Sequence, residues 1–283
     1  MVRLPGIVCC SMLMLFAIQQ TSAQSPEFSF SAGAGISGLK YAMNQGSSIL
    51  QPGFRAAFGY TWFINNKWGL STGMELGYYH TKASLTNGEV FTSNITDTDG
   101  EGFEHRVQTK GYQEQQKLYA LNIPLLVQFH TPSAKNTQWY AKGGLKISIP
   151  VSATYAVQAD ELTATGYYPN LNLEITDLPA HGFGSQVNWK GSGHYSFNPS
   201  VSLVAETGAR FRTGNTRVLY AGAFIEYGLN NIKQEQDISS LISYNYATLA
   251  NSKANGIFSV PAVTGNIRLL SYGIRISYSF TGR

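Results

Sequence analysis

Regular alternation of apolar residues with polar or small ones constrains this chain more than any other feature. Apolar side chains occupy every second position in eight runs: 28–36, 54–62, 68–78, 119–129, 139–151, 201–211, 221–229 and 270–280. Successive side chains of a β-strand point to opposite faces, so a period of two indicates a strand with one apolar and one polar face. The sequence therefore predicts eight β-strands.

The connections between these runs alternate between short and long. Three are short turns, Asn65-Asn66-Lys67, Thr131 to Gln138 and Thr213 to Thr216, and four are long polar segments, 40–52, 81–114, 156–195 and 232–264. Short turns at one end and long loops at the other are typical of barrels in bacterial outer membranes. We therefore predict an all-β fold: an eight-stranded antiparallel up-and-down transmembrane β-barrel with short periplasmic turns and long extracellular loops.

The N-terminus has the features of a secretory signal peptide. Arg3 supplies a positive charge, residues 7–18 an apolar core, and Thr21-Ser22-Ala23 a cleavage site of small residues. The division is then 1–23 signal peptide and 24–283 outer-membrane β-barrel domain. Cys9 and Cys10 are the only cysteines, so the exported chain would contain neither disulfides nor thiolate metal ligands.

Composition excludes several other classes. Hydrophobic residues make up 43% and charged residues only 13%, and 36 of the residues are aromatic, which argues against disorder. Beyond the signal peptide no stretch offers the roughly 20 consecutive apolar residues of a spanning helix. Without Arg3 the chain has 19 basic and 16 acidic residues, and so small a positive charge indicates no nucleic-acid partner.

The polarity of the two strand faces favours a membrane barrel over a soluble one. One face is almost free of charge and carries aromatic residues near strand ends, as a lipid-facing surface does. The other face combines glycine and serine with a set of charged residues that we expect in the lumen: Arg55, Glu75, Lys142, Lys146, Glu206, Arg210, Arg212, Glu226 and Arg275. In so narrow a barrel these charges should pair and fill the interior. The alternative is a small anion-preferring conduit.

Three segments resemble a known family. Residues 121–126 (Leu-Asn-Ile-Pro-Leu-Leu) and 227–232 (Tyr-Gly-Leu-Asn-Asn-Ile) are similar to strand segments of small Bacteroidetes outer-membrane barrels, the PorT-like or outer-membrane β-barrel domain proteins. The alternation of residues 274–280 resembles the C-terminal assembly signal of such barrels, although Thr281-Gly282-Arg283 follow Phe280. The resemblance covers the whole mature chain and implies no uniform activity, catalytic residue or cofactor.

Three further groups of residues are candidate sites. His80, with Ser84 and Glu89 beyond it, imitates the His–Ser–acid set of outer-membrane lipid enzymes, but closeness in sequence is not triad geometry. The five histidines, at 80, 105, 130, 181 and 194, lack metal-ligand spacing. An acidic cluster (Asn94, Asp97, Asp99, Glu101, Glu104) resembles half of a calcium loop, yet Ile95 and Arg106 occupy positions that should bind the ion. We expect no metal, cofactor or catalytic site.

These observations predict an integral protein of the bacterial outer membrane, not an enzyme, with a structural or surface-interaction role carried by its loops. A small-solute pore is the first alternative, and a lipid-modifying enzyme the second. The expected partners are outer-membrane lipid including lipopolysaccharide, the barrel-assembly machinery during insertion, and a surface partner of the loops.

Overall fold

The computed structural model describes residues 26–97, 99–132, 136–214, 216–234, 240–245, 249, 252–261 and 263–281. The predicted signal peptide (1–23), with both cysteines, lies outside these residues. Within the described ranges, no helix has the length and hydropathy needed to cross a membrane.

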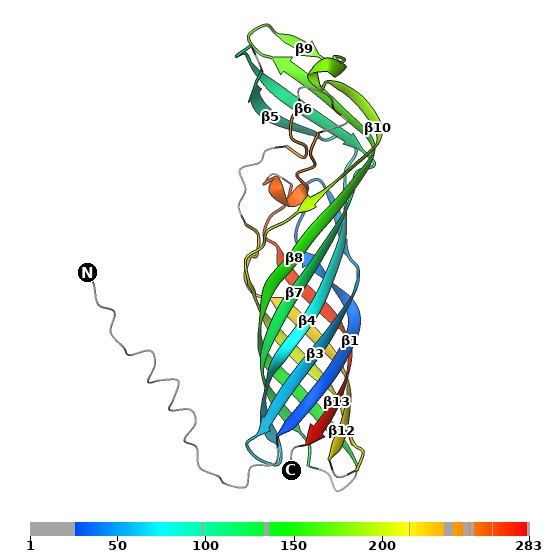
Figure 1. The fold of residues 1–283 in the computed structure, drawn as a ribbon, viewed down its shortest axis with the longest axis vertical. Coiled ribbons are helices and arrows are strands. Elements are labelled where there is room, and N and C mark those ends of the chain that lie inside the picture. The colour runs from blue at the N-terminus through cyan, green and yellow to red at the C-terminus, as the bar shows by residue number, and fades with distance from the viewer. Residues whose placement is uncertain are drawn as a thin grey trace, which may run out of the picture.

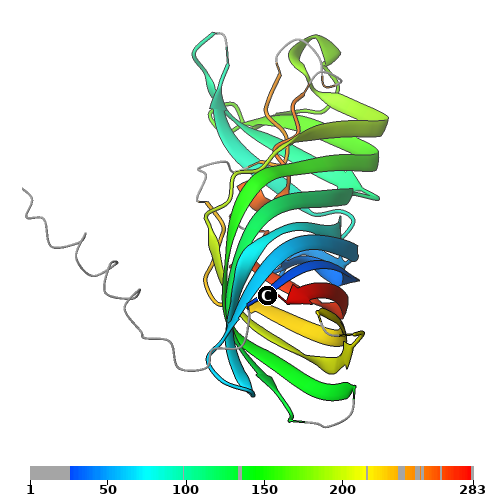
Figure 2. The same cartoon turned by 60° about the horizontal axis from the view of Figure 1, so that its bottom comes forward.

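Eight antiparallel strands form a ring, as predicted (Figures 1 and 2). Each pairs with a ring neighbour on both sides, and the pairing of β8 with β11 completes the ring. In ring order the strands are β1 (Glu27–Lys40), β3 (Pro52–Phe63), β4 (Trp68–Leu85), β7 (Gln113–His130), β8 (Thr137–Tyr168), β11 (Ser200–Arg212), β12 (Arg217–Gly228) and β13 (Arg268–Thr281). The strand ends that the three short turns join lie together at the bottom of Figure 1, which we call the turn end; the opposite end is the loop end.

The predicted long loops are wrong in part, because they contain five further strands. These are β2 (Gly46–Leu50), β5 (Val90–Thr96), β6 (Gly102–Lys110), β9 (Leu173–Ile175) and β10 (Gly184–His194). β6 and β10 pair with the two edges of β8 beyond the ring, and β5 pairs with β6. We call β5, β6, the end of β8, β9 and β10 the outer sheet (top of Figure 1). The sequence does not predict these strands, because their inward faces combine apolar residues with polar ones, such as His105 and Thr109 of β6.

The barrel wall continues well beyond the part of its strands that is needed to cross a membrane, as β8 shows. It has 32 residues, whereas a tilted strand needs only about 9–11 to cross a bilayer. A register shift between Tyr119 and Ala120 of β7 lies opposite residues 150–152 of β8. Below this irregularity the odd-numbered positions of β8 face outward, and above it Ala153, Tyr155 and Val157 are buried inside.

At the turn end the outer surface is apolar. Leu76 is 62% exposed, Ile274 64% and Leu145 46%, and these side chains point away from the ring. Aromatic residues border the band on both sides: Trp68 packs on Phe129 near the turns. Tyr78 packs on Tyr119 at the other border, with 5.0 Å between ring centroids. This apolar band is the surface that a lipid-embedded barrel presents.

Beyond Tyr78 and Tyr119 the polarity of the wall is reversed. Outward positions become polar, and the interior holds the main hydrophobic core, which includes Leu118, Val157 and Leu162. The long connection between β12 and β13 folds into this space, and its short 3-10 helix η4 (Ile257–Ser259) is fully buried. We call the described part of this connection (240–245, 249, 252–261 and 263) the cap. The loop-end half is thus built like a water-soluble β-protein, with its apolar residues inside.

Candidate functional site

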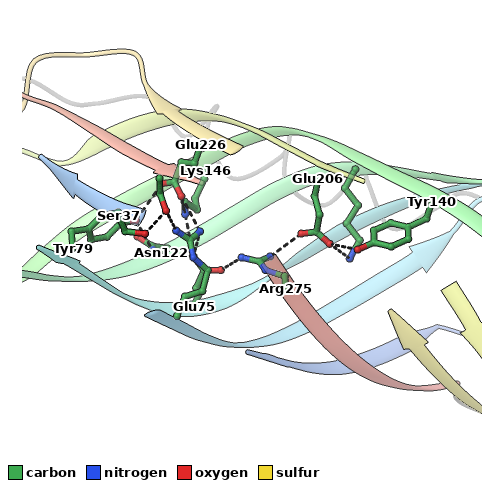
Figure 3. Close-up of polar contacts among 12 residues, drawn as sticks. Ser37, Glu75, Tyr79, Asn122, Tyr140, Lys146, Glu206, Glu226 and Arg275 are labelled. Carbon is green, nitrogen blue, oxygen red and sulfur yellow. Dashed lines mark hydrogen bonds and ion pairs between the residues drawn. The ribbon is translucent and has the colours of Figure 1, made fainter. Parts of the chain in front are cut away.

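Two buried glutamates organise the lumen behind the apolar band (Figure 3). Glu75 of β4 accepts from Arg55 at 3.4 Å and from Lys146 at 3.0 Å. Glu226 of β12 accepts from Arg55 at 3.0 Å, and Lys146 forms a second ion pair with it. The four residues come from β4, β3, β8 and β12, so the cluster spans the interior. An isolated charge in such an interior is very costly, and this reciprocal pairing offsets the cost.

Arg275 of β13 extends the cluster toward the turn end. Its guanidinium pairs with Glu75 and, at 3.2 Å, with Glu206 of β11. Glu206 also accepts from the hydroxyl of Tyr140 at 2.8 Å, and the ammonium of Lys142 lies 4.0 Å away. Figure 3 shows the chain of contacts that runs from Glu226 through Arg275 to Tyr140.

A second ion pair closes the lumen nearer the turns. Arg210 pairs with Glu27 at 2.5 Å, and both side chains are only 3% exposed. Tyr220 donates to Glu27 at 2.6 Å and accepts from Arg210 at 2.9 Å. Glu27 was missed by the sequence analysis, although it shares the inward parity of Ser29 and Ser31. The predicted strand began one residue too late to include it.

Eight of the nine predicted lumen residues line the interior: Arg55, Glu75, Lys142, Lys146, Glu206, Arg210, Glu226 and Arg275. Arg212 does not, because it lies exposed at the end of β11. Glu226 pairs with Arg55 and Lys146, and not with Arg210 or Arg212 of the neighbouring strand. In the β11–β12 register Glu226 lies opposite Val204 and Arg210 opposite Tyr220, six residues or roughly 20 Å apart along the strand.

Glycines make room for this network. Gly33 of β1 lies in register with Arg55 on one side and Arg275 on the other. A Cβ at Gly33 would lie 3.0 Å from Cγ of Arg55. A Cβ at Gly77 would lie 2.7 Å from the side-chain nitrogen of Asn122, which donates to Glu75 at 3.1 Å. The inward-facing glycines therefore leave the space that the long charged side chains occupy.

A different buried carboxylate lies in the loop-end half. Glu114 of β7 is 1% exposed and accepts from Tyr112 at 2.8 Å, from Gln116 at 2.9 Å and from Tyr195. The backbone N–H of Ile257, in the cap, donates to it at 2.9 Å. These donors are all neutral, and burial raises the pKa of Glu114. Glu114 therefore ties the cap to the barrel wall.

The other weighed residues are not brought together into a site. Ser84 shares a hydrogen bond with Ser47 at 3.1 Å, and Glu89 accepts from Gln45 at 3.1 Å. His80 lies on the outer face of β4 beside the ring of Tyr78. Sequence proximity of these three residues thus gives no catalytic arrangement.

The acidic cluster forms a turn of its own. Asp97 accepts from the backbone N–H groups of Asp99 at 3.0 Å and Glu101 at 2.9 Å. The hydrogen bond from Glu101 is the main reason that the pKa of Asp97 lies below its usual value. Across the described part of the chain, no three His, Cys, Asp or Glu residues lie close enough together to hold a metal ion.

Comparisons with known proteins gave one family match and several similar solved structures. Residues 19–234 match the family model of the outer membrane protein β-barrel domain. Similar solved structures include Ail, the attachment invasion locus protein of Yersinia pestis, at 12% identity over 90% of this chain and 99% of that one, with a TM-score of 0.34. Neisserial surface protein A matches at 10% over 91% and 98% (TM-score 0.34), and OprG from Pseudomonas aeruginosa at 10% over 92% and 98% (TM-score 0.38). Comparison with curated proteins gave no match.

Proposed function

Because the chain belongs to the outer membrane protein β-barrel domain family and lies in the bacterial outer membrane, we propose that it is a barrel closed to solutes whose outer sheet meets a partner at the cell surface. The loop end is then extracellular and the turn end periplasmic. The finer likeness to PorT-like Bacteroidetes proteins is part of the proposal and rests on the segments 121–126 and 227–232.

The observation that carries the proposal is the occupied interior. Glu75 and Glu226 with their cations fill the lumen at the level of the apolar band. Glu27 and Arg210 fill it near the turns, and the cap occupies the extracellular end. An eight-stranded barrel leaves room only for side chains. Separating one of its ion pairs is costly, because each charged group would be left buried without a partner. These features favour a plug over a conduit.

The outer sheet supports the second half of the proposal. One of its faces is buried against the cap through Phe103, Val107 and Leu162. The opposite face is mostly polar, although Val90 and Val187 are exposed on the sheet. Arg106 pairs there with Glu104 at 2.7 Å and with Glu174 at 3.4 Å. Loops held on a rigid β-scaffold are where binding residues concentrate. The role proposed is therefore recognition and not catalysis, and the barrel-assembly machinery is the partner expected during insertion.

Planar-bilayer recording of the full-length mature protein tests the closed state. We expect no steady conductance, because both the ion pairs and the cap obstruct the lumen. Glu75→Gln should give brief openings, since it leaves Arg55, Lys146 and Arg275 with fewer partners. Glu101→Gln, which changes an exposed carboxylate in the acidic turn, is the matched control. A large and stable wild-type conductance would replace this proposal with the small-solute pore.

A further inference from the structure

A row of basic and hydroxyl side chains crosses the outer wall of the barrel. His80 of β4 lies in register with Lys117 of β7. Lys117 lies in register with Thr154 of β8, and Thr154 with His194 of β10. All four side chains point outward, since they occupy exposed or half-exposed positions of their strands. Four strands that are separate in sequence thus place their side chains side by side.

The row begins where the apolar band ends. On β4 and β7, His80 and Lys117 lie two residues beyond Tyr78 and Tyr119, the bordering tyrosines. On β8, Thr154 lies three residues beyond Val151, which is 66% exposed. Two residues of a strand tilted by about 40° rise by about 5 Å. This distance places the row beside the phosphate-bearing layer of the outer leaflet when the tyrosines lie at the bilayer interface.

A surface cavity of about 630 Å³ lies along the row. Lys117, Thr154 and His194 line it, and Lys253 of the cap lines it from a distant part of the sequence. The next outward residue of β4 is Lys82, paired in register with Gln115. The cavity is therefore flanked by cations from three separate segments.

No carboxylate neutralises these cations. Within the described ranges, none of Lys82, Lys117 and Lys253 takes part in an ion pair. Like charges held together without a counter-ion attract an anion.

We propose that this row and its cavity bind phosphate groups of the phosphorylated glycolipid in the outer leaflet. Phosphate suits the donors present, because it accepts charge-assisted hydrogen bonds from lysine and further bonds from histidine and hydroxyl groups. The acyl chains of the same lipid would lie along the apolar band directly beneath. The site lies on the outer wall of the barrel, so this proposal does not depend on whether the lumen conducts.

Binding of defined lipids to the detergent-purified mature protein, measured by native mass spectrometry, tests the site. The probes are diphosphoryl lipid A and lipid A from which both phosphates have been removed. We expect the phosphorylated form alone to bind tightly. Lys82→Gln/Lys117→Gln should weaken its binding by about twenty-five-fold, since each lysine beside an anionic surface contributes about fivefold.

Two control variants separate this site from general charge effects. Lys67→Gln/Lys110→Gln makes the same change in net charge on exposed residues away from the row and should leave binding unchanged. Lys82→Arg/Lys117→Arg keeps the charges and should retain binding, and the electrophoretic shift between unboiled and boiled samples shows that each variant is folded. Equal binding of the two lipids, or equal loss in the two Gln variants, would overturn the proposal. Competition by millimolar inorganic phosphate would assign the site to the free anion and overturn the lipid assignment.

Discussion

At the scale of single residues, the lumen depends on a few carboxylates that each serve several cations. Glu75 contacts Arg55, Lys146 and Arg275, and Arg55 and Lys146 also contact Glu226. Counting Glu27, four carboxylates face five cations in the interior, because Lys142 and Arg210 complete the set. With more cations than carboxylates, removing one acid leaves a larger imbalance than removing one base.

Glu75→Gln should therefore be strongly destabilising. The substitution keeps the shape of the side chain but leaves three buried cations competing for fewer carboxylate oxygens. The free energy of unfolding should fall by about 3–5 kcal/mol, the usual cost of breaking a buried pair. The measurement is the temperature at which the folded band disappears in unboiled electrophoresis. Glu101→Gln should leave that temperature unchanged, and an unchanged temperature in Glu75→Gln would show that these pairs do not stabilise the barrel.

The apolar band makes a prediction at Leu145. This side chain is 46% exposed near the middle of the apolar part of β8, so arginine there would enter the lipid. We expect Leu145→Arg to lower the free energy of unfolding in lipid vesicles by about 2–4 kcal/mol, measured by urea titration. Gln158→Arg, on the outward face of the same strand beyond the band, is the control and should be nearly neutral. Equal effects at both positions would contradict the assigned band.

At the scale of elements, the cap is held by a carboxylate with no cation beside it. Burial raises the pKa of Glu114 above its ordinary value, so the protonated form favours the docked cap. The stability that this group contributes is complete below the ordinary pKa of about 4.3. It is lost as the pH rises through the raised value.

Hydrogen exchange of residues 252–261, corrected for the intrinsic effect of pH, measures this dependence. In the wild type, protection of the cap should fall as the pH is raised from about 4. In Glu114→Gln, whose side chain is neutral at every pH, the profile should be flat. Protection that increases with pH in the wild type would contradict this role of Glu114.

The sequence predicted the strands of the ring but not the further strands and the cap of the loop-end half. The reason is physical. Alternation marks a strand when one face is apolar over its whole length, as in 68–78 and 119–129. In β8 the odd positions remain apolar past the irregularity near residue 151, but Tyr155 and Val157 face the interior instead of the lipid, and alternation alone does not reveal that change. Ile257 and Phe258 of the cap lie in a short helix whose residues are all buried, so the sequence there shows no alternation of apolar and polar residues.

Strand parity predicted which residues of the candidate site face the lumen, but it could not predict how they pair. Parity identified the inward positions of Glu75, Lys146 and Glu226 because every lumen residue shares one face of its strand. It could not choose partners, which depend on register and on the distance across the interior. The row from His80 to His194 was unpredictable for the same reason, because it joins four strands through pairings that no local pattern encodes.

At the scale of the whole molecule, the barrel is one continuous wall with two opposite polarities. In the turn-end half the wall is apolar outside and charged inside, and in the loop-end half it is polar outside and apolar inside. The change occurs within single strands and needs no domain boundary. Lipid surrounds the first half and water the second, and each half buries the residues that its surroundings disfavour.

Spin labels along β8 test this reversal most directly. Single cysteines at Leu145, Ile147 and Ile149 should be accessible to oxygen, which partitions into lipid, and shielded from a water-soluble nickel chelate. Labels at Ala156 and Gln158 should show the opposite preference, while a label at the buried Ala153 should be shielded from both reagents. The account predicts a change of preference between Val151 and Ala156 in vesicle-reconstituted protein. Nickel access at Leu145, or oxygen preference that continues to Gln158, would contradict it.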